Sequence, residues 1–177
     1  MQSVTGRPAA LARAWHYLRS CGLLLLPVIA WNLAFAPLLP LAFAPERFWR
    51  DIPTPLAFAE NGLRVAVFAL PFLMPLDRAA RRRTAALTLF GAGSLLYFGA
   101  WLPLMLAPHS AWSHSPIGFT APALTPLVWL AGIGLLGRRL YWPSPYRRWH
   151  YLVLSAAFVA VHFAHALLVF QRSASSG

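Results

Sequence analysis

The sequence predicts an all-α integral membrane protein, a single bundle of five transmembrane helices. Of its 177 residues, 59% are hydrophobic and only 11% are charged, whereas charged residues make up about a quarter of a typical soluble domain. Apolar runs of the length that a helix needs to cross a bilayer alternate with short segments rich in arginine. Because lipid cannot satisfy backbone N–H and C=O groups, we expect these runs to be helical.

The first apolar run covers residues 21–44 and follows a basic N-terminal segment, residues 1–20. The run is longer than the apolar core of a signal peptide, which spans roughly 7–15 residues. Pro45 also follows the "LAFA" sequence at which cleavage would occur. We therefore expect an uncleaved membrane span.

Four further runs complete the predicted bundle. Only the first of these contains charged side chains, and only the last lacks proline, so we expect the last to be the straightest helix. A short external tail, residues 171–177, follows it. The four runs cover residues 56–76, 84–107, 117–137 and 151–170.

Arginine placement predicts the orientation of the bundle. Eleven arginines lie in the N-terminal segment and in residues 77–83 and 138–150, against three in the alternate loops. Loops rich in Lys and Arg remain cytoplasmic, so the N-terminus is predicted inside and the C-terminus outside a cell membrane that the chain crosses several times. Eight of these arginines are expected to contact anionic lipid headgroups: Arg78, Arg81, Arg82, Arg83, Arg138, Arg139, Arg147 and Arg148.

Polar side chains in the predicted spans share one level near the outer face. At ~1.5 Å per residue, His162 and His165 lie ~16 Å and ~21 Å from the cytoplasmic end of the last span. Glu60 and Arg64 reach a similar level from outside. Because ionisable groups in a membrane usually line a site or pathway, we predict an outer-leaflet cavity that binds an apolar or amphipathic ligand or a partner subunit. Its candidate lining residues are Asn32, Glu60, Asn61, Arg64, Tyr97, Trp101, His162 and His165.

The same residues also fit a purely structural role and several other functions. His162 and His165 can be neutral rings hydrogen-bonded within the bundle, and Glu60 can form a structural i,i+4 pair with Arg64. Alternatively, the two histidines hold a transition metal or haem in a redox or enzyme subunit. A proton-coupled carrier using Glu60 and the histidines is a further alternative. The metal hypothesis adds two histidines of the predicted external loop as candidate ligands, His109 and His114.

The remaining features bear on partners and activity. The chain has 15 basic and 4 acidic residues. This excess of positive charge does not indicate nucleic-acid binding, because the arginines cluster where membrane loops are expected. Cys21 is the only cysteine, and we find no catalytic or nucleotide-binding motif, so a non-enzymatic protein is favoured. A stripe of small residues on the last span is suited to close packing against another helix of the bundle or another subunit: Ala156, Ala160 and Ala164.

Overall fold

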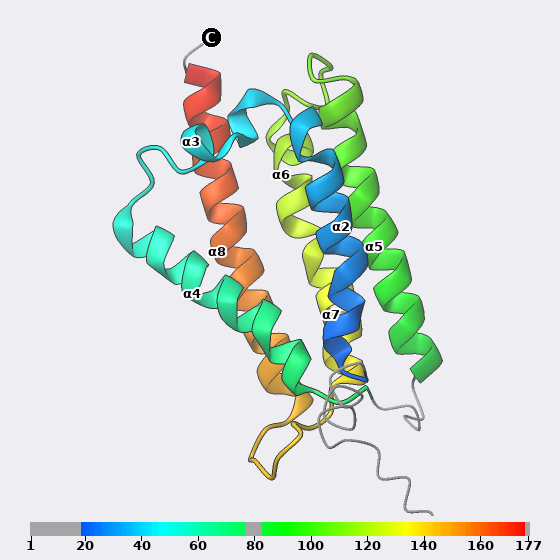
Figure 1. The fold of residues 1–177 in the computed structure, drawn as a ribbon. Coiled ribbons are helices and arrows are strands. Elements are labelled where there is room, and N and C mark those ends of the chain that lie inside the picture. Colours follow the sequence, from blue (N-terminus) through cyan, green and yellow to red (C-terminus); the bar gives the residue numbers. More distant parts are fainter. Residues whose placement is uncertain (1–18, 77–82, 176–177) are drawn as a thin grey trace, which may run out of the picture.

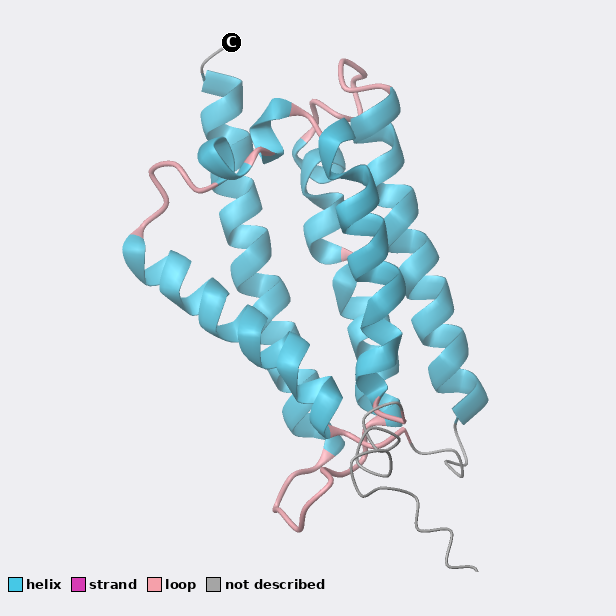
Figure 2. Ribbon diagram, viewed as in Figure 1, coloured by secondary structure: helices cyan, strands magenta, loops and turns pink. Residues whose placement is uncertain are grey.

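The computed structural model describes residues 19–76 and 83–175, which form helices joined by loops, with no strand among them (Figures 1 and 2). Five helical stretches are long and apolar enough to cross a membrane. The predicted all-α class and the number of candidate spans are therefore confirmed. The five stretches are Cys21–Leu38, Thr54–Leu73, Arg83–Leu106, Pro116–Leu136 and Arg148–Ala174.

The first stretch is shorter than its apolar run. It consists of η1 (Cys21–Leu25), α2 (Leu26–Phe35) and η2 (Ala36–Leu38), after which Leu39 takes an extended conformation. The expectation that residues 39–44 continue this helix is wrong, because Pro37 and Pro40 cannot donate the backbone hydrogen bonds that a continuing helix requires.

The chain between the first two candidate spans, residues 39–53, is here called the cap segment. It contains two short turns of helix, η3 (Leu41–Phe43) and α3 (Pro45–Phe48). Proline precedes or begins both turns, as expected where a chain changes direction repeatedly. The cap segment therefore lies across the end of the bundle and does not extend a helix (Figure 1).

The other candidate spans follow the predicted order. The second is α4 (Thr54–Ala69) with η4 (Leu70–Leu73), and the third is α5 (Arg83–Leu106), which continues through Pro103. The fourth divides at Pro126 into α6 and α7, and the proline-free fifth is one uninterrupted helix of 28 residues, α8. The bounds of these last helices are α6 (Pro116–Leu124), α7 (Pro126–Leu136) and α8 (Arg148–Ser175).

The centre of the bundle is the packing of α5 against α7. A Cβ added to Gly93 would lie 2.5 Å from the backbone nitrogen of Trp129, and one added to Gly132 would lie 2.6 Å from that of Phe90. Each helix thus presents a glycine to the backbone of the other, the arrangement that small residues allow in membrane helix pairs. The α7 side chains at the centre are fully or almost fully buried: Trp129, Leu130, Ile133 and Leu136.

Helix α8 is covered on one side only. It packs against α4, α6 and α7, and these helices cover the side that carries Phe158 and His165. The three alanines of the small-residue stripe, Ala156, Ala160 and Ala164, are exposed. The expectation that this stripe packs against another helix of the bundle is wrong, because α4, α6 and α7 all lie against the other side; its role in an oligomer stays a prediction.

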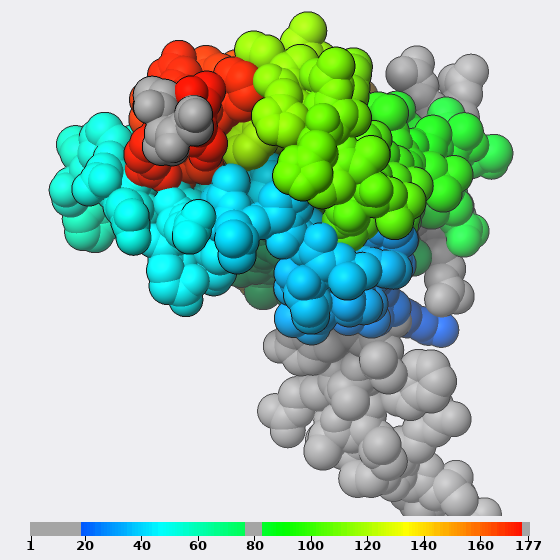
Figure 3. Space-filling view, turned by 90° about the horizontal axis from the view of Figure 1, so that it is seen from above, coloured from blue at the N-terminus to red at the C-terminus, as the bar shows by residue number. Residues whose placement is uncertain are grey.

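The two ends of the bundle differ in what they carry. The cap segment, the α5–α6 loop and the end of α8 lie together at one end, here called the cap end (Figure 1). Viewed onto this end, Figure 3 shows the light-blue and cyan cap segment beside the red end of α8 and the green α5–α6 loop. The described arginines predicted to meet lipid headgroups are all exposed at or near the opposite end: Arg83, Arg138, Arg139, Arg147 and Arg148.

Candidate functional site

The carboxylate of Glu60 connects α4 to α8. Its side chain is fully buried. Oε1 accepts hydrogen bonds from Arg64, one turn along α4, and from Nδ1 of His162 at 2.9 Å. Oε2 lies at hydrogen-bonding distance from Nδ1 of His165. Glu60, Arg64, His162 and His165 therefore form one hydrogen-bonded group, here called the Glu60 cluster.

The second nitrogen of His165 joins the cap segment to this cluster. Its Nε2 lies 2.9 Å from the carbonyl oxygen of Phe48, and since a carbonyl only accepts, Nε2 must carry a hydrogen. Nδ1 faces a carboxylate oxygen, so a further proton lies between the His165 ring and Glu60. The Glu60–His165 pair is thus neutral as a unit, which suits a site where both side chains are fully buried.

The positive charge of the cluster lies on its most accessible member. The Arg64 side chain is 37% exposed, and its guanidinium carbon lies 5.3 Å from the ring centroid of Trp49, a cation–π distance. The Trp49 ring also contacts His165, with the centroids 4.6 Å apart. The cap segment therefore covers the cluster with an aromatic side chain as well as with the Phe48 carbonyl.

A second contact between the cap segment and α8 lies near the end of that helix. The guanidinium of Arg172 donates to the backbone carbonyls of Arg47, at 2.8 Å, and of Arg50. Arg47 lies in the last turn of α3 and Arg50 lies two residues beyond its end, and the Arg47 carbonyl also accepts from the backbone N–H of Arg50 at 3.3 Å. His165 and Arg172, two turns apart on α8, thus hold the same segment in place.

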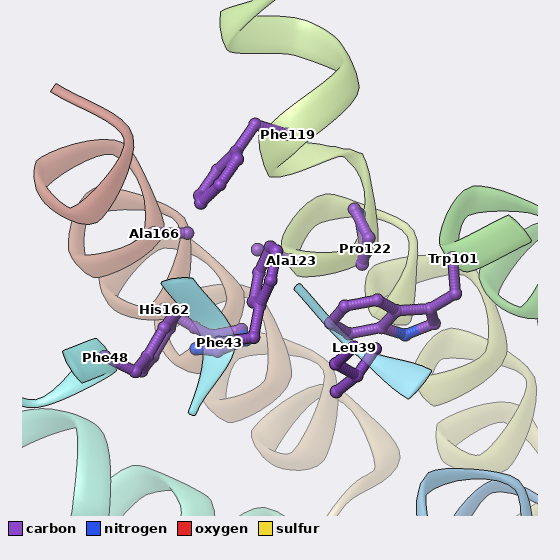
Figure 4. A pocket seen from close by; sticks show the side chains of 9 residues that line it. All are labelled: Leu39, Phe43, Phe48, Trp101, Phe119, Pro122, Ala123, His162 and Ala166. Atoms are coloured by element: carbon purple, nitrogen blue, oxygen red, sulfur yellow. The ribbon is translucent and has the colours of Figure 1, made fainter. Parts of the chain in front are cut away.

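A cavity of about 170 Å³ lies beside the Glu60 cluster, between the cap segment, α5, α6 and α8. Figure 4 shows its wall, in which the ring centroids of His162 and Phe48 are 6.3 Å apart and those of Phe48 and Phe43 are 6.0 Å apart. Most of the wall is aromatic or aliphatic, and His162 is the one member of the Glu60 cluster that reaches it. The lining residues are Leu39, Phe43, Phe48, Trp101, Phe119, Pro122, Ala123, His162 and Ala166.

His162 lines this cavity and has one ring nitrogen that no described residue hydrogen-bonds. Its Nδ1 is bonded to Glu60 on the α4 side, and no described residue hydrogen-bonds its Nε2. The ring is stacked on Phe158 of the preceding turn, with an interplanar angle of 4°. The carboxylate and the stacked ring fix the orientation of the imidazole, which leaves Nε2 available to a molecule in the cavity.

A second cavity of about 150 Å³ lies between α2 and α5. The Tyr97 hydroxyl donates to Oδ1 of Asn32 at 2.7 Å in its wall. Leu39 and Trp101 line both cavities, so they separate the Asn32–Tyr97 pair from the larger cavity. The structure thus divides the predicted lining residues into two groups.

Three sequence-predicted residues lie away from both groups. Asn61 is exposed, and its amide donates to the Ala57 carbonyl of its own helix at 3.0 Å. His109 and His114 are exposed in the α5–α6 loop, with ring centroids 6.2 Å apart. Three of the predicted headgroup-contacting arginines, Arg78, Arg81 and Arg82, lie outside the described residues.

Sequence reasoning missed most of the cavity wall. The cap-segment rings of Phe43 and Phe48, and Phe119 of α6, are ordinary apolar residues in a chain rich in them, so no pattern distinguishes them. The Phe48 carbonyl that receives His165 is a backbone group, which every residue has. Only the packing of the cap segment against α6 and α8 brings these groups together.

The described part of the chain offers few side chains that could bind a metal ion together. It contains no group of three or more His, Cys, Asp or Glu side chains placed to hold a metal ion. Glu60 and the Phe48 carbonyl occupy both nitrogens of His165, which leaves Nε2 of His162 as the one open ligand atom of the cluster.

Comparison with known proteins identifies no relative: no family model, no curated protein and no solved structure matches the chain.

Proposed function

We propose that this chain is a non-enzymatic membrane protein that binds a small apolar ligand in the cavity between the cap segment and α8. The aromatic and aliphatic wall, which contains a single side chain from the polar Glu60 cluster, carries this proposal. Ligand pockets commonly combine such walls with a few fixed polar groups. Cavities of about 150 Å³ with apolar walls bind ligands the size of benzene, so the expected ligand, or the part of it that enters, is one or two rings in size.

In this proposal the Glu60 cluster holds the site and does not perform chemistry. Its carboxylate fixes His162 at the wall, and His165 holds the Phe48 carbonyl of the cap segment. Phe43 and Phe48 of that segment form part of the wall. Buried charges are costly in a membrane. In this proposal they hold open a cavity that apolar side chains would otherwise fill.

We place the cavity in the outer half of the cell membrane, with the N-terminus inside. The support is the arginine distribution: the exposed arginines Arg83, Arg138, Arg139, Arg147 and Arg148 lie at or near the end opposite the cap segment, and arginine-rich ends are cytoplasmic. In this orientation the cap segment faces outward, and the exposed alanine stripe of α8 faces lipid or a partner subunit.

The alternative of a metal or haem held jointly by the two histidines has less support. His165 would have to give up Glu60 or the Phe48 carbonyl to provide a ligand atom. A porphyrin is also far larger than the benzene-sized ligands that cavities of this volume take. We therefore favour an organic ligand over a metal centre.

A pair of alanine substitutions on α8 tests the proposal. Ala166 lines the cavity, whereas Ala164 is exposed on the other side of the helix. We expect Ala166→Leu to weaken saturable binding of tritiated 2-methylnaphthalene at least tenfold, because the added carbons occupy the cavity. Ala164→Leu should bind like the unmodified protein. Binding is measured in lipid nanodiscs, with empty nanodiscs as the partition control, and equal affinity of the two variants contradicts the proposal.

A further inference from the structure

We infer that the ligand of this cavity is a phenol-class molecule, an aromatic ring bearing a hydroxyl that donates to Nε2 of His162. This inference rests on the proposed function and goes further by giving the ligand a polar group and a place for it. It is carried by three features: the hydrogen-bond partner of His162 and its place in the wall, the charge balance of the Glu60 cluster, and the composition of the wall.

The hydrogen-bond partners assign the tautomer of His162. Its Nδ1 lies 2.9 Å from Oε1 of Glu60, and that oxygen also accepts from Arg64, so Oε1 is an acceptor and Nδ1 carries the hydrogen. In a neutral imidazole the other nitrogen then has a lone pair and accepts. His162 lines the cavity, and we assign this lone pair to a ligand there.

The charge balance favours a neutral His162. The Glu60–His165 pair is neutral as a unit, and Arg64 already gives the cluster one positive charge. No other charged side chain forms a salt bridge with the cluster in the described residues. A second proton on His162 would create two uncompensated positive charges around a fully buried carboxylate, which burial disfavours. Nε2 is therefore an acceptor.

Glu60 also fixes which nitrogen of His162 accepts. A carboxylate bonded to one nitrogen of an imidazole sets the tautomer and the orientation of the ring, as it does for histidines that bind metals. Glu60 would thus orient the acceptor of a hydroxyl donor without touching the ligand. Glu60 is in this respect a positioning residue for His162.

The wall selects for an aromatic molecule with one donor. Apart from His162, the only polar side-chain atom among the lining residues belongs to the indole of Trp101, which can only donate. Four aromatic rings contribute to the wall, Phe43, Phe48, Trp101 and Phe119, and edge or stacked contacts with them favour a flat ring. A ligand without a donor would leave Nε2 desolvated and unpaired, which disfavours its binding.

Two probes of nearly equal shape test the inference. 2-Naphthol carries a hydroxyl where 2-methylnaphthalene carries a methyl group. We expect the unmodified protein in nanodiscs at pH 7 to bind tritiated 2-naphthol about tenfold more tightly than tritiated 2-methylnaphthalene, after subtraction of partition into empty nanodiscs. One hydrogen bond to a buried acceptor accounts for a ratio of this size.

The His162→Phe variant should lose this preference, with the two affinities becoming equal, because phenylalanine keeps the ring and removes the acceptor. His109→Phe, in the exposed loop away from the cavity, should keep it. Equal affinities in the unmodified protein, which needs no variant to fold, would overturn the inference while leaving the proposed function standing. A preference retained in His162→Phe overturns it as well, and saturable binding of neither probe overturns both.

Discussion

At the scale of single residues, one carboxylate organises the site. Glu60 is the only acidic side chain in the candidate spans, and it accepts from Arg64 and His162 and shares a proton with His165. Each of these partners has a second contact: Arg64 with Trp49, His165 with the Phe48 carbonyl, and His162 with the cavity. The consequences of losing Glu60 should therefore extend beyond α4.

Removal of this carboxylate should destabilise the protein strongly. We expect Glu60→Ala to lower the free energy of unfolding by about 3 kcal/mol, because Arg64 and the two imidazoles would remain in place without their acceptor. Glu60→Gln, which keeps one acceptor oxygen and the side-chain volume, should cost about 1 kcal/mol. Unfolding by SDS in mixed micelles measures both. Asn61→Ala, at an exposed neighbouring position, is the control and should change little; an equal loss in Asn61→Ala and Glu60→Ala would refute this account.

At the scale of helices, two different kinds of helix–helix contact hold the bundle together. Helices α5 and α7 meet through glycine, with Gly93 and Gly132 each against the backbone of the partner helix. Helices α4 and α8 instead meet through the Glu60 cluster, with a second polar contact from the Tyr151 hydroxyl to the Val67 carbonyl at 3.2 Å. The cavity adjoins the Glu60 cluster at His162 of α8, and no α4 residue lines it.

The glycine contact should not tolerate a methyl group. We expect Gly132→Ala to lower the free energy of unfolding by about 2 kcal/mol, because its Cβ would collide with the backbone of α5, which cannot rotate away as a side chain can. Gly91→Ala is the matched control, since a Cβ there has no neighbour within 4 Å, and it should change stability by less than about 0.5 kcal/mol. The same SDS titration compares them, and similar losses in both variants would show that close packing is not the cause.

At the scale of the whole molecule, the charge asymmetry of the two ends defines the proposed orientation. Residues 138–147 connect α7 to α8 at the end opposite the cap segment, and α8 finishes at the cap end. In the proposed topology, the odd number of spans puts the start of the first span and the end of α8 on opposite sides of the membrane. The orientation is therefore decided by one measurement of which end is accessible.

Labelling of introduced cysteines in intact bacterial cells provides that measurement. We expect a membrane-impermeant maleimide to label Ala174→Cys, exposed near the end of α8, and to leave Ser144→Cys, exposed in the α7–α8 loop, unlabelled until the cells are lysed. The native Cys21 is fully buried, so its background should be low. Labelling of Ser144→Cys alone in intact cells would reverse the proposed orientation.

The sequence by itself determined the number and order of the candidate spans and predicted the common level of the polar side chains. These are local properties: hydrophobic length decides where a helix crosses lipid, and the rise per residue decides how deep each side chain lies. The depth reasoning therefore placed Glu60, Arg64, His162 and His165 at one level before any contact between their helices was known.

Only the tertiary structure decided which of these groups meet. Whether Glu60 pairs with Arg64 alone or also with α8 depends on the tilt of α4 and on the side of α8 that it covers, and neither leaves a periodic signal in the sequence. The same packing leaves Ala160 and its neighbours exposed and places the Phe48 carbonyl over His165. Helix formation is a property of neighbouring residues, but a site at the junction of α4, α8 and the cap segment is a property of how their surfaces fit.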